Sequence, residues 1–417
     1  MTSPTATAPT GAALPNTSKW LTLLLCFIVA LLEGLDLQAA GIAAPGIGAE
    51  FKLLPPQMGG MFSAGLVGLL PSALFGGWLA DRIGRKKVLI GSVLLFGLFS
   101  LATAHVWDYP SLLAARFLAG LGLGAALPIL IALSSEAADE HKRGMAVSLT
   151  YAGIPLGGAL AAVLGMLNFG GGWRGLFYVG GVLPMAIALL LVVLLPESRA
   201  FVNRNLGQAQ PDRPRSSNAG SSMAGLFQGG MWKSTLLLWL ASFFVLTVLY
   251  MLLNWLPSLL QGKGFRRADA GMVQLFFNFG GAAGSLLVGK LMDGKERVIT
   301  AVCIYLGMLL SLAGLGLSDG LGLMLLAGLG AGFCTLGGQL VLYAMAPTLY
   351  PTSIRATGVG ASITVGRLGA ISGPMIAGQV LAAGMGLGGV MAASSPGIVV
   401  AAVAAMVLIR AQQTLHR

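Results

Sequence analysis

Long apolar segments, separated by short breaks of polar residues, proline or glycine, run through almost all of the chain. Each segment is close to the roughly 20 residues that an α-helix needs to cross the hydrocarbon core of a bilayer. The pattern predicts twelve transmembrane helices, at residues 20–46, 57–80, 88–106, 109–134, 145–168, 174–195, 233–259, 270–292, 298–317, 321–346, 355–382 and 386–409.

Polar segments divide this pattern into two halves. Residues 1–18 and 411–417 are polar tails, the first of which is expected to be disordered, and a linker rich in Ser, Asn, Gln, Arg and Pro covers 196–232. The remaining segments, 19–195 and 233–410, would each hold six helices. Gly77-Trp-Leu-Ala-Asp81 recurs as Gly289-Lys-Leu-Met-Asp293, and Arg143-Gly144 recurs as Arg355-Ala356 at the same spacing. Such a duplication is typical of transporters whose substrate site lies between two repeats.

Composition narrows the class of protein. Of the 417 residues, 56% are hydrophobic and 9% are charged, whereas a soluble domain carries about 25% charged residues. Lipid is therefore the expected solvent, and the chain is predicted to be an all-α integral membrane protein. The net charge of +11 does not indicate nucleic-acid binding, because the basic residues form short clusters between apolar segments.

These basic residues predict the orientation in the membrane. The side of the termini and the linker receives 18 Lys and Arg residues, and the opposite side receives 5. By the positive-inside rule, both termini and the linker are expected in the cytoplasm.

Four ionisable residues stand inside apolar segments, where a charge is costly and usually functional. Glu33 and Asp36 are spaced i, i+3 on the first span, so they share a helix face and are expected to hold a coupling proton. Arg116 on the fourth span reaches a similar depth from the opposite side. It could release an acid to take a substrate carboxylate, or it could form a permanent structural ion pair with these acids. Arg367 on the eleventh span is either a second anion ligand or a partner of backbone carbonyls or Gln339.

Weaker candidates are the aromatic and amide side chains inside the spans. They are expected to line a cavity that stacks a ring and bonds a phenol, although helix packing explains each of them as well. These residues are Tyr151, Tyr250, Asn254 and Gln339, with Trp255, Gln274, Asn278 and Tyr343 beside them.

Four charged residues lie in loops on the side of the linker: Asp81, Arg82, Arg85 and Arg143. They are too far from the midplane to hold substrate. Either they form a charge latch that stabilises one access state, or they act only as topology signals.

The run from Gly77 to Lys87 resembles the loop signature of the major facilitator superfamily, and the run from Arg116 to Gly124 resembles its fourth-helix motif. Pro196-Glu197-Ser198 also recurs in that superfamily. Glu33-Gly34-Leu35-Asp36 is similar to the Asp-Gly-x-Asp motif of the aromatic acid:proton symporter family, with Glu in place of the first Asp. The wider run from Leu32 to Gly41 resembles the branch of that family that transports 3-(3-hydroxyphenyl)propionate.

The resemblance implies a secondary transporter that imports 3-(3-hydroxyphenyl)propionate or a related phenylpropionate or benzoate by proton symport with alternating access. The expected location is the bacterial inner membrane, with a monomeric chain, no cofactor and no metal, and the proton gradient as energy source. A proton-driven efflux antiporter of hydrophobic compounds is the alternative, and the two intramembrane arginines favour an anion over a cationic drug. An enzyme is disfavoured because no nucleophile, metal or phosphate-binding constellation can be assembled.

Overall fold

The computed structural model describes residues 16–198, 201–202, 223–228, 230–292, 297–351 and 354–415, and every regular element in these residues is a helix. Twelve helices have at least 20 residues: α1 (Asn16–Phe51), α2 (Pro55–Ile83), α3 (Arg85–Ala104), α4 (Tyr109–Ala137), α5 (Arg143–Met166), α6 (Trp173–Leu194), α9 (Trp232–Gly262), α10 (Arg267–Met292), α11 (Arg297–Leu317), α12 (Leu321–Leu349), α13 (Arg355–Ala382) and α14 (Gly386–Leu415). Two single turns, η1 (Glu140–Lys142) and η2 (Phe169–Gly171), lie in the connections of the first half.

Most of these helices fit a bilayer. Among the described residues, ten are long and apolar enough to cross a membrane, and α2 adds an eleventh as a span that bends by 43° between Ala73 and Phe75. The twelfth, α13, is richer in glycine, serine and threonine, and it packs between α2 and α9. The predicted all-α membrane fold with about twelve helices is therefore confirmed.

The predicted tails and linker lie mostly outside the described residues, which exclude 1–15, 199–200, 203–222, 229 and 416–417. Where the structure does describe them, helix extends further than expected. Thus α1 begins at Asn16 and α14 continues to Leu415.

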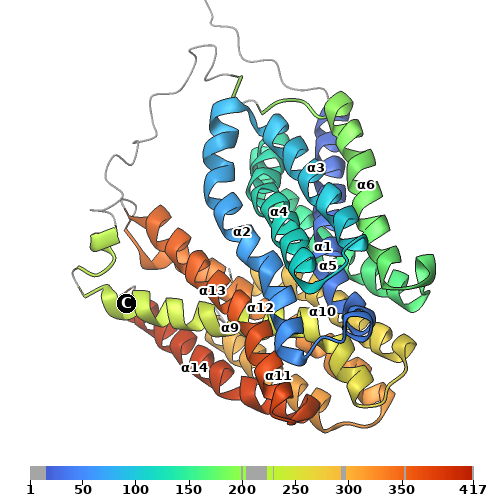
Figure 1. Cartoon of the computed structure of the whole chain (residues 1–417). Coiled ribbons are helices and arrows are strands. Elements are labelled where there is room, and N and C mark those ends of the chain that lie inside the picture. Colours follow the sequence, from blue (N-terminus) through green and yellow to red (C-terminus); the bar gives the residue numbers. More distant parts are fainter. Residues whose placement is uncertain are drawn as a thin grey trace, which may run out of the picture.

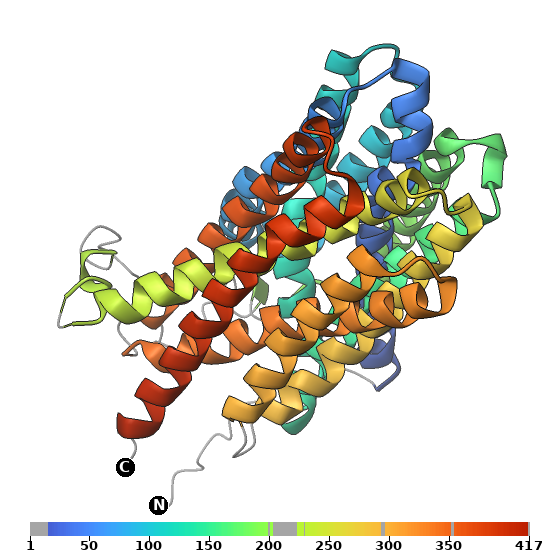
Figure 2. The same ribbon diagram turned by 90° about the horizontal axis from the view of Figure 1, so that it is seen from below.

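The helices form two groups. Helices α1–α6 pack mainly with one another, as do α9–α14, and the main contacts between the groups are made by α2 with α13, α5 with α10, and α1 with α9. Figure 1 shows the first group (blue to green) above the second (yellow-green to red). The bundle has two ends: the linker side, where α6 stops and α9 starts, and the far side, where α1 meets α2 and α13 meets α14. In Figure 2 the start of α9 and the end of α14 lie on the same side.

The two groups touch near the far side. A Cβ added at Gly59 of α2 would lie 2.7 Å from the carbonyl oxygen of Pro374 in α13, so these helices are in backbone contact there. Ser63 donates a 2.7 Å hydrogen bond to the carbonyl of Ile371, and the rings of Phe62 and Trp255 meet edge to face at 5.2 Å. Toward the linker side α2 and α13 diverge, as Figure 1 shows.

Candidate transport site

Asp36 of α1 and Arg116 of α4 form an ion pair inside the first group. Arg116 Nη1 lies 3.3 Å from Asp36 Oδ2, and Nη2 donates to the backbone carbonyl of Asp36 at 3.4 Å. The Arg116 guanidinium also lies over the ring of Phe177, 5.6 Å from its centre. Both charged residues are buried, with exposed fractions of 0% and 4%. The structure thus brings together the acid and the arginine that reach similar depths from opposite sides.

This pair leaves several polar atoms without partners. Within the described residues, Asp36 Oδ1, Arg116 Nε and Glu33 Oε2 are buried and make no hydrogen bond. Buried polar atoms are normally satisfied, so an unpaired one calls for an explanation. A group of three such atoms around two acids is consistent with a site that takes up a proton or another polar ligand.

Glu33 faces a different arginine. It is buried on α1, one turn before Asp36, and the charge that acts on it is that of Arg367 in α13 of the second group. Arg367 is half-buried and makes no hydrogen bond or ion pair within the described residues. The two acids therefore do not share one arginine. Asp36 pairs with an arginine of its own half, whereas Glu33 interacts electrostatically with an arginine of the other half.

Three tyrosines lie within the electrostatic influence of Arg367. Tyr151 of α5, Tyr250 of α9 and Tyr343 of α12 interact electrostatically with one another and with this arginine. Tyr151 and Tyr250 also interact electrostatically with Glu33. Because Tyr151 comes from the first half and the other two from the second, their hydroxyl groups lie where the halves meet.

The two amide residues among the predicted substrate ligands, Gln339 and Asn254, make no hydrogen bond to Arg367 within the described residues. Gln339 lies on α12 and donates a 2.8 Å hydrogen bond to the hydroxyl of Tyr343, so it supports the tyrosine group. Asn254 is buried on α9 and donates to the carbonyl of Tyr250 on its own helix, at 2.7 Å. Its backbone packs against Gly41 of α1, where an added Cβ would lie 2.6 Å from the Asn254 carbonyl oxygen. Asn254 is thus placed at a contact between the halves.

The four loop residues lie on the linker side, and only one joins an ion pair. Arg85 pairs with Glu136 at the end of α4, which also accepts a 2.7 Å hydrogen bond from Ser198. Arg82 stacks on Trp78 of its own helix. Asp81 and Arg143 are exposed and make no hydrogen bond or ion pair within the described residues. All ion pairs of the described residues join groups of the same half, so in this state the loop is not latched to the second half.

Glu197 organises this loop, although sequence reasoning gave it no role. Its Oε1 accepts hydrogen bonds from the backbone amides of Lys86 and Ser198, at 3.0 and 2.9 Å. Gly84 has φ +105°, and a Cβ there would lie 2.3 Å from Glu197 Oε2, so only glycine fits. The Pro196-Glu197-Ser198 motif was the available signal. Glu136, in contrast, lies at the end of a span with nothing in the sequence to mark it.

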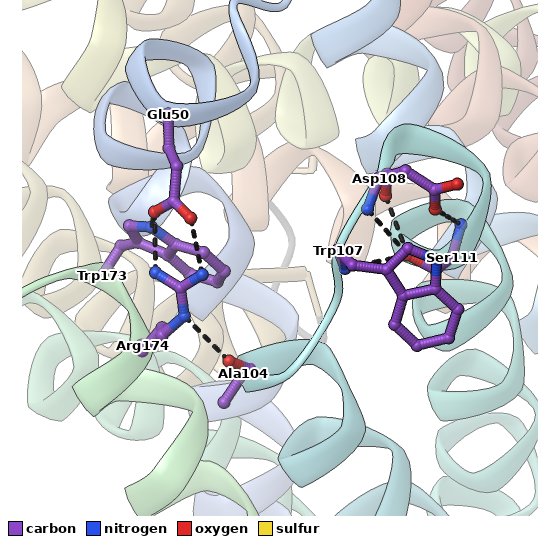
Figure 3. A network of polar contacts seen from close by, with 7 residues as sticks. All are labelled: Glu50, Ala104, Trp107, Asp108, Ser111, Trp173 and Arg174. Atoms are coloured by element: carbon purple, nitrogen blue, oxygen red, sulfur yellow. Dashed lines mark hydrogen bonds and ion pairs between the residues drawn. The ribbon is translucent and has the colours of Figure 1, made fainter.

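On the far side a polar network ties the first half together (Figure 3). Glu50, near the end of α1, accepts from the Trp173 indole at 2.8 Å and from both terminal nitrogens of Arg174, at 2.7 and 2.6 Å. Arg174 Nε donates to the carbonyl of Ala104 at the end of α3. Nearby, Asp108 caps α4, and its hydrogen bonds with Ser111 lower its pKa. This network fixes the ends of α1, α3 and α6 to one another.

Two groups of membrane-crossing helices, with buried charged and tyrosine side chains near their boundary, are typical of a polytopic membrane transporter. The comparisons with known proteins give the family. The profile of the Major Facilitator Superfamily matches residues 26–374, and the chain belongs to that superfamily.

The relatives are transporters, not enzymes. The 3-(3-hydroxy-phenyl)propionate transporter of Escherichia coli (strain K12) is 55% identical over 388 residues, which cover 93% of each chain. The 4-hydroxybenzoate transporter PcaK of Pseudomonas putida is 37% identical over 379 residues, covering 85% of this chain and 84% of the relative. Among solved structures, a bacterial homologue of the human lysosomal transporter Spinster superposes with a TM-score of 0.74 at 17% identity, covering 97% of this chain and 98% of that one.

Proposed function

We propose that this transporter imports an aromatic monocarboxylate of the size of 3-(3-hydroxyphenyl)propionate together with at least one proton. The observation that carries the proposal is Arg367, a half-buried arginine at the boundary of the halves whose hydrogen-bonding capacity is unused within the described residues. A guanidinium has a planar fork that matches a carboxylate. The named substrates of the two relatives above are aromatic acids, which carry such a group.

Arg367 suits the substrate better than Arg116 does. Asp36 already occupies Arg116, on both its carboxylate and its backbone carbonyl. Arg367, by contrast, interacts electrostatically with three tyrosines, which come from both halves. Their rings offer surfaces for an aromatic ligand, and their hydroxyl groups can bond a phenol. A substrate held there would contact both halves at once.

Glu33 provides the coupling to protons. When it is ionised, its charge competes with the substrate carboxylate for Arg367. When it is protonated, the arginine is free to bind the anion. Proton and substrate therefore bind together on one side and leave together on the other, after the halves rock about the fixed site.

The proposed direction is import, because a symporter moves its substrate along with the inward flow of protons. The linker side is assigned to the cytoplasm of a bacterial inner membrane because its loops carry most of the basic residues. With the halves in contact near the far side, the structure then represents an inward-facing state. Both termini would be cytoplasmic, the chain would work as a monomer, and no cofactor is required because the proton gradient supplies the energy.

The test is uptake of radiolabelled 3-(3-hydroxyphenyl)propionate and benzoate into proteoliposomes, with and without an inward proton gradient. Gradient-dependent accumulation that is lost in Arg367→Gln and Glu33→Gln supports the proposal. Arg297→Gln is the matched control, because this arginine is exposed at the start of α11 and makes no ion pair within the described residues. If neither acid accumulates and cationic dyes are extruded instead, the proposed import function is wrong.

A further inference from the structure

A cluster of three buried amides joins the halves just beyond the transport site. Gln38 of α1 and Asn278 of α10 exchange two hydrogen bonds: Gln38 Nε2 donates to Asn278 Oδ1 at 2.7 Å, and Asn278 Nδ2 donates to Gln38 Oε1 at 2.9 Å. Gln274, one turn earlier on α10, donates to the same Gln38 oxygen at 2.7 Å. The exposed fractions of the three residues are 2%, 0% and 0%.

The position of the cluster is that of a barrier. Gln38 follows Asp36 by two residues, about 3 Å further toward the far side along α1. Beyond it come the Phe62–Trp255 ring contact and the 2.6 Å hydrogen bond from Arg267 to Asn168, which also join the two halves. Going from the acids toward the far side, the amides are therefore the first polar contact that joins the two halves.

The chemistry of the cluster suits a contact that opens. Ion pairs of the described residues remain within one half, whereas this contact between the halves is made by neutral amides. Separating two neutral amides and exposing them to water costs less free energy than separating a buried pair of charges. In addition, Gln274 Oε1 is buried without a partner, so the closed cluster is not fully satisfied. Opening to water would supply that missing hydrogen bond.

We propose that Gln38, Gln274 and Asn278 form the far-side gate of the transport path, closed in this structure and opened once in each cycle. This inference needs only alternating access and is independent of which compound is carried or whether protons are coupled. Gln274 and Asn278 were candidates for lining a substrate cavity or for helix packing, whereas Gln38 was not among the candidates. As a gate, they set the balance between the two access states without touching the substrate.

A glycine beside the gate provides a way to open it by adding a single methyl group. Gly158 of α5 packs against the cluster, and a Cβ at this position would lie 1.8 Å from Gln38 Nε2 and 2.6 Å from Asn278 Oδ1. The substitution Gly158→Ala should therefore force the two amides apart. On the same helix, Gly144 has open space around it, so Gly144→Ala is the matched control.

The experiment measures the width of the far side directly. Spin labels at Trp107→Cys and Leu317→Cys report on it, because both positions are exposed far-side residues, one in each half. Of the three native cysteines only Cys303 is exposed, so the background variant is Cys303→Ser. Double electron–electron resonance in lipid nanodiscs measures the distance between the two labels. It gives the ratio of the population with a long distance to the population with a short one.

Gly158→Ala and Asn278→Ala are each expected to raise this ratio about tenfold, while Gly144→Ala leaves it unchanged. The double variant Gln38→Asn with Asn278→Gln exchanges the two side chains and keeps their combined length. Its ratio should therefore be close to that of the wild type. An unchanged ratio in folded Gly158→Ala and Asn278→Ala protein would refute the gate. Because no substrate is added, this result stands apart from the outcome of the uptake assay.

Discussion

Among the ion pairs of the described residues, that between Asp36 and Arg116 is the most deeply buried, with side-chain exposed fractions of 0% and 5%. It fixes α1 to α4, one turn away from the acid that faces the other half. Its partners come from two helices of the same half, so the pair can remain closed while the halves move. We therefore propose that Asp36 holds α1 in place and that Glu33 competes for Arg367.

The first prediction concerns the stability that this pair supplies. Asp36→Asn leaves the Arg116 charge buried without its counterion, which typically costs about 3–5 kcal/mol. The double variant Asp36→Asn with Arg116→Gln removes both charges and should recover much of that loss. Thermal unfolding of the purified protein in detergent measures the effect.

The control for this series is Lys19→Gln, which breaks an ion pair whose acid, Asp139, is 50% exposed. Exposed pairs contribute about 0–1 kcal/mol, so the midpoint should change little. If Asp36→Asn were as mild as Lys19→Gln, the buried pair would not be the tie between α1 and α4 described here.

The second prediction is that substrate binding depends on pH through Glu33. As pH rises and Glu33 ionises, its charge occupies Arg367, so the affinity for the aromatic acid should fall. In Glu33→Gln the competing charge is absent, and the affinity should stay at its low-pH value across the series. Calorimetric titration at several pH values measures this, and a wild-type affinity that is independent of pH would contradict the competition.

Much of the fold could be predicted from the sequence because a bilayer constrains it strongly. Twenty-residue apolar segments have no alternative to crossing as helices. The approach of Asp36 to Arg116 could also be anticipated, since the depth of a residue follows from counting along its helix. Both inferences use only local sequence and the thickness of the membrane.

The division of the two acids between two arginines could not be predicted in this way. Glu33 and Asp36 lie on the same side of α1, and which arginine each meets depends on how α4 and α13 cross that helix. Gln38 was overlooked for a related reason: its partners on α10 belong to the other half and lie more than 230 residues away. The available signal was that Gln38, too, is a polar residue inside an apolar span.

The third prediction tests whether the tyrosines recognise the ring hydroxyl of the substrate. A site that bonds a hydroxyl group discriminates strongly against the analogue that lacks it. Tyr343→Phe should therefore weaken binding of 3-(3-hydroxyphenyl)propionate about tenfold while changing the binding of 3-phenylpropionate little. The control is Tyr305→Phe, because this buried hydroxyl on α11 has no partner within the described residues. Equal losses for both ligands would assign Tyr343 to packing.

The fourth prediction concerns the linker-side loop. Gly84→Ala places a side chain at φ +105° and against Glu197 Oε2, so the backbone strain alone should cost about 1–3 kcal/mol. It should also break the two amide hydrogen bonds that Glu197 accepts.

The comparison that isolates this effect is Gly77→Ala on α2, where no atom lies near an added Cβ. Alanine is favoured over glycine in a helix by about 1 kcal/mol, so this variant should be as stable as the wild type or more so. Thermal unfolding of the two variants side by side gives opposite signs if Gly84 is required by its conformation and by Glu197. A Gly84→Ala protein as stable as Gly77→Ala would show that the loop tolerates another conformation, and Glu197 would then not determine its shape.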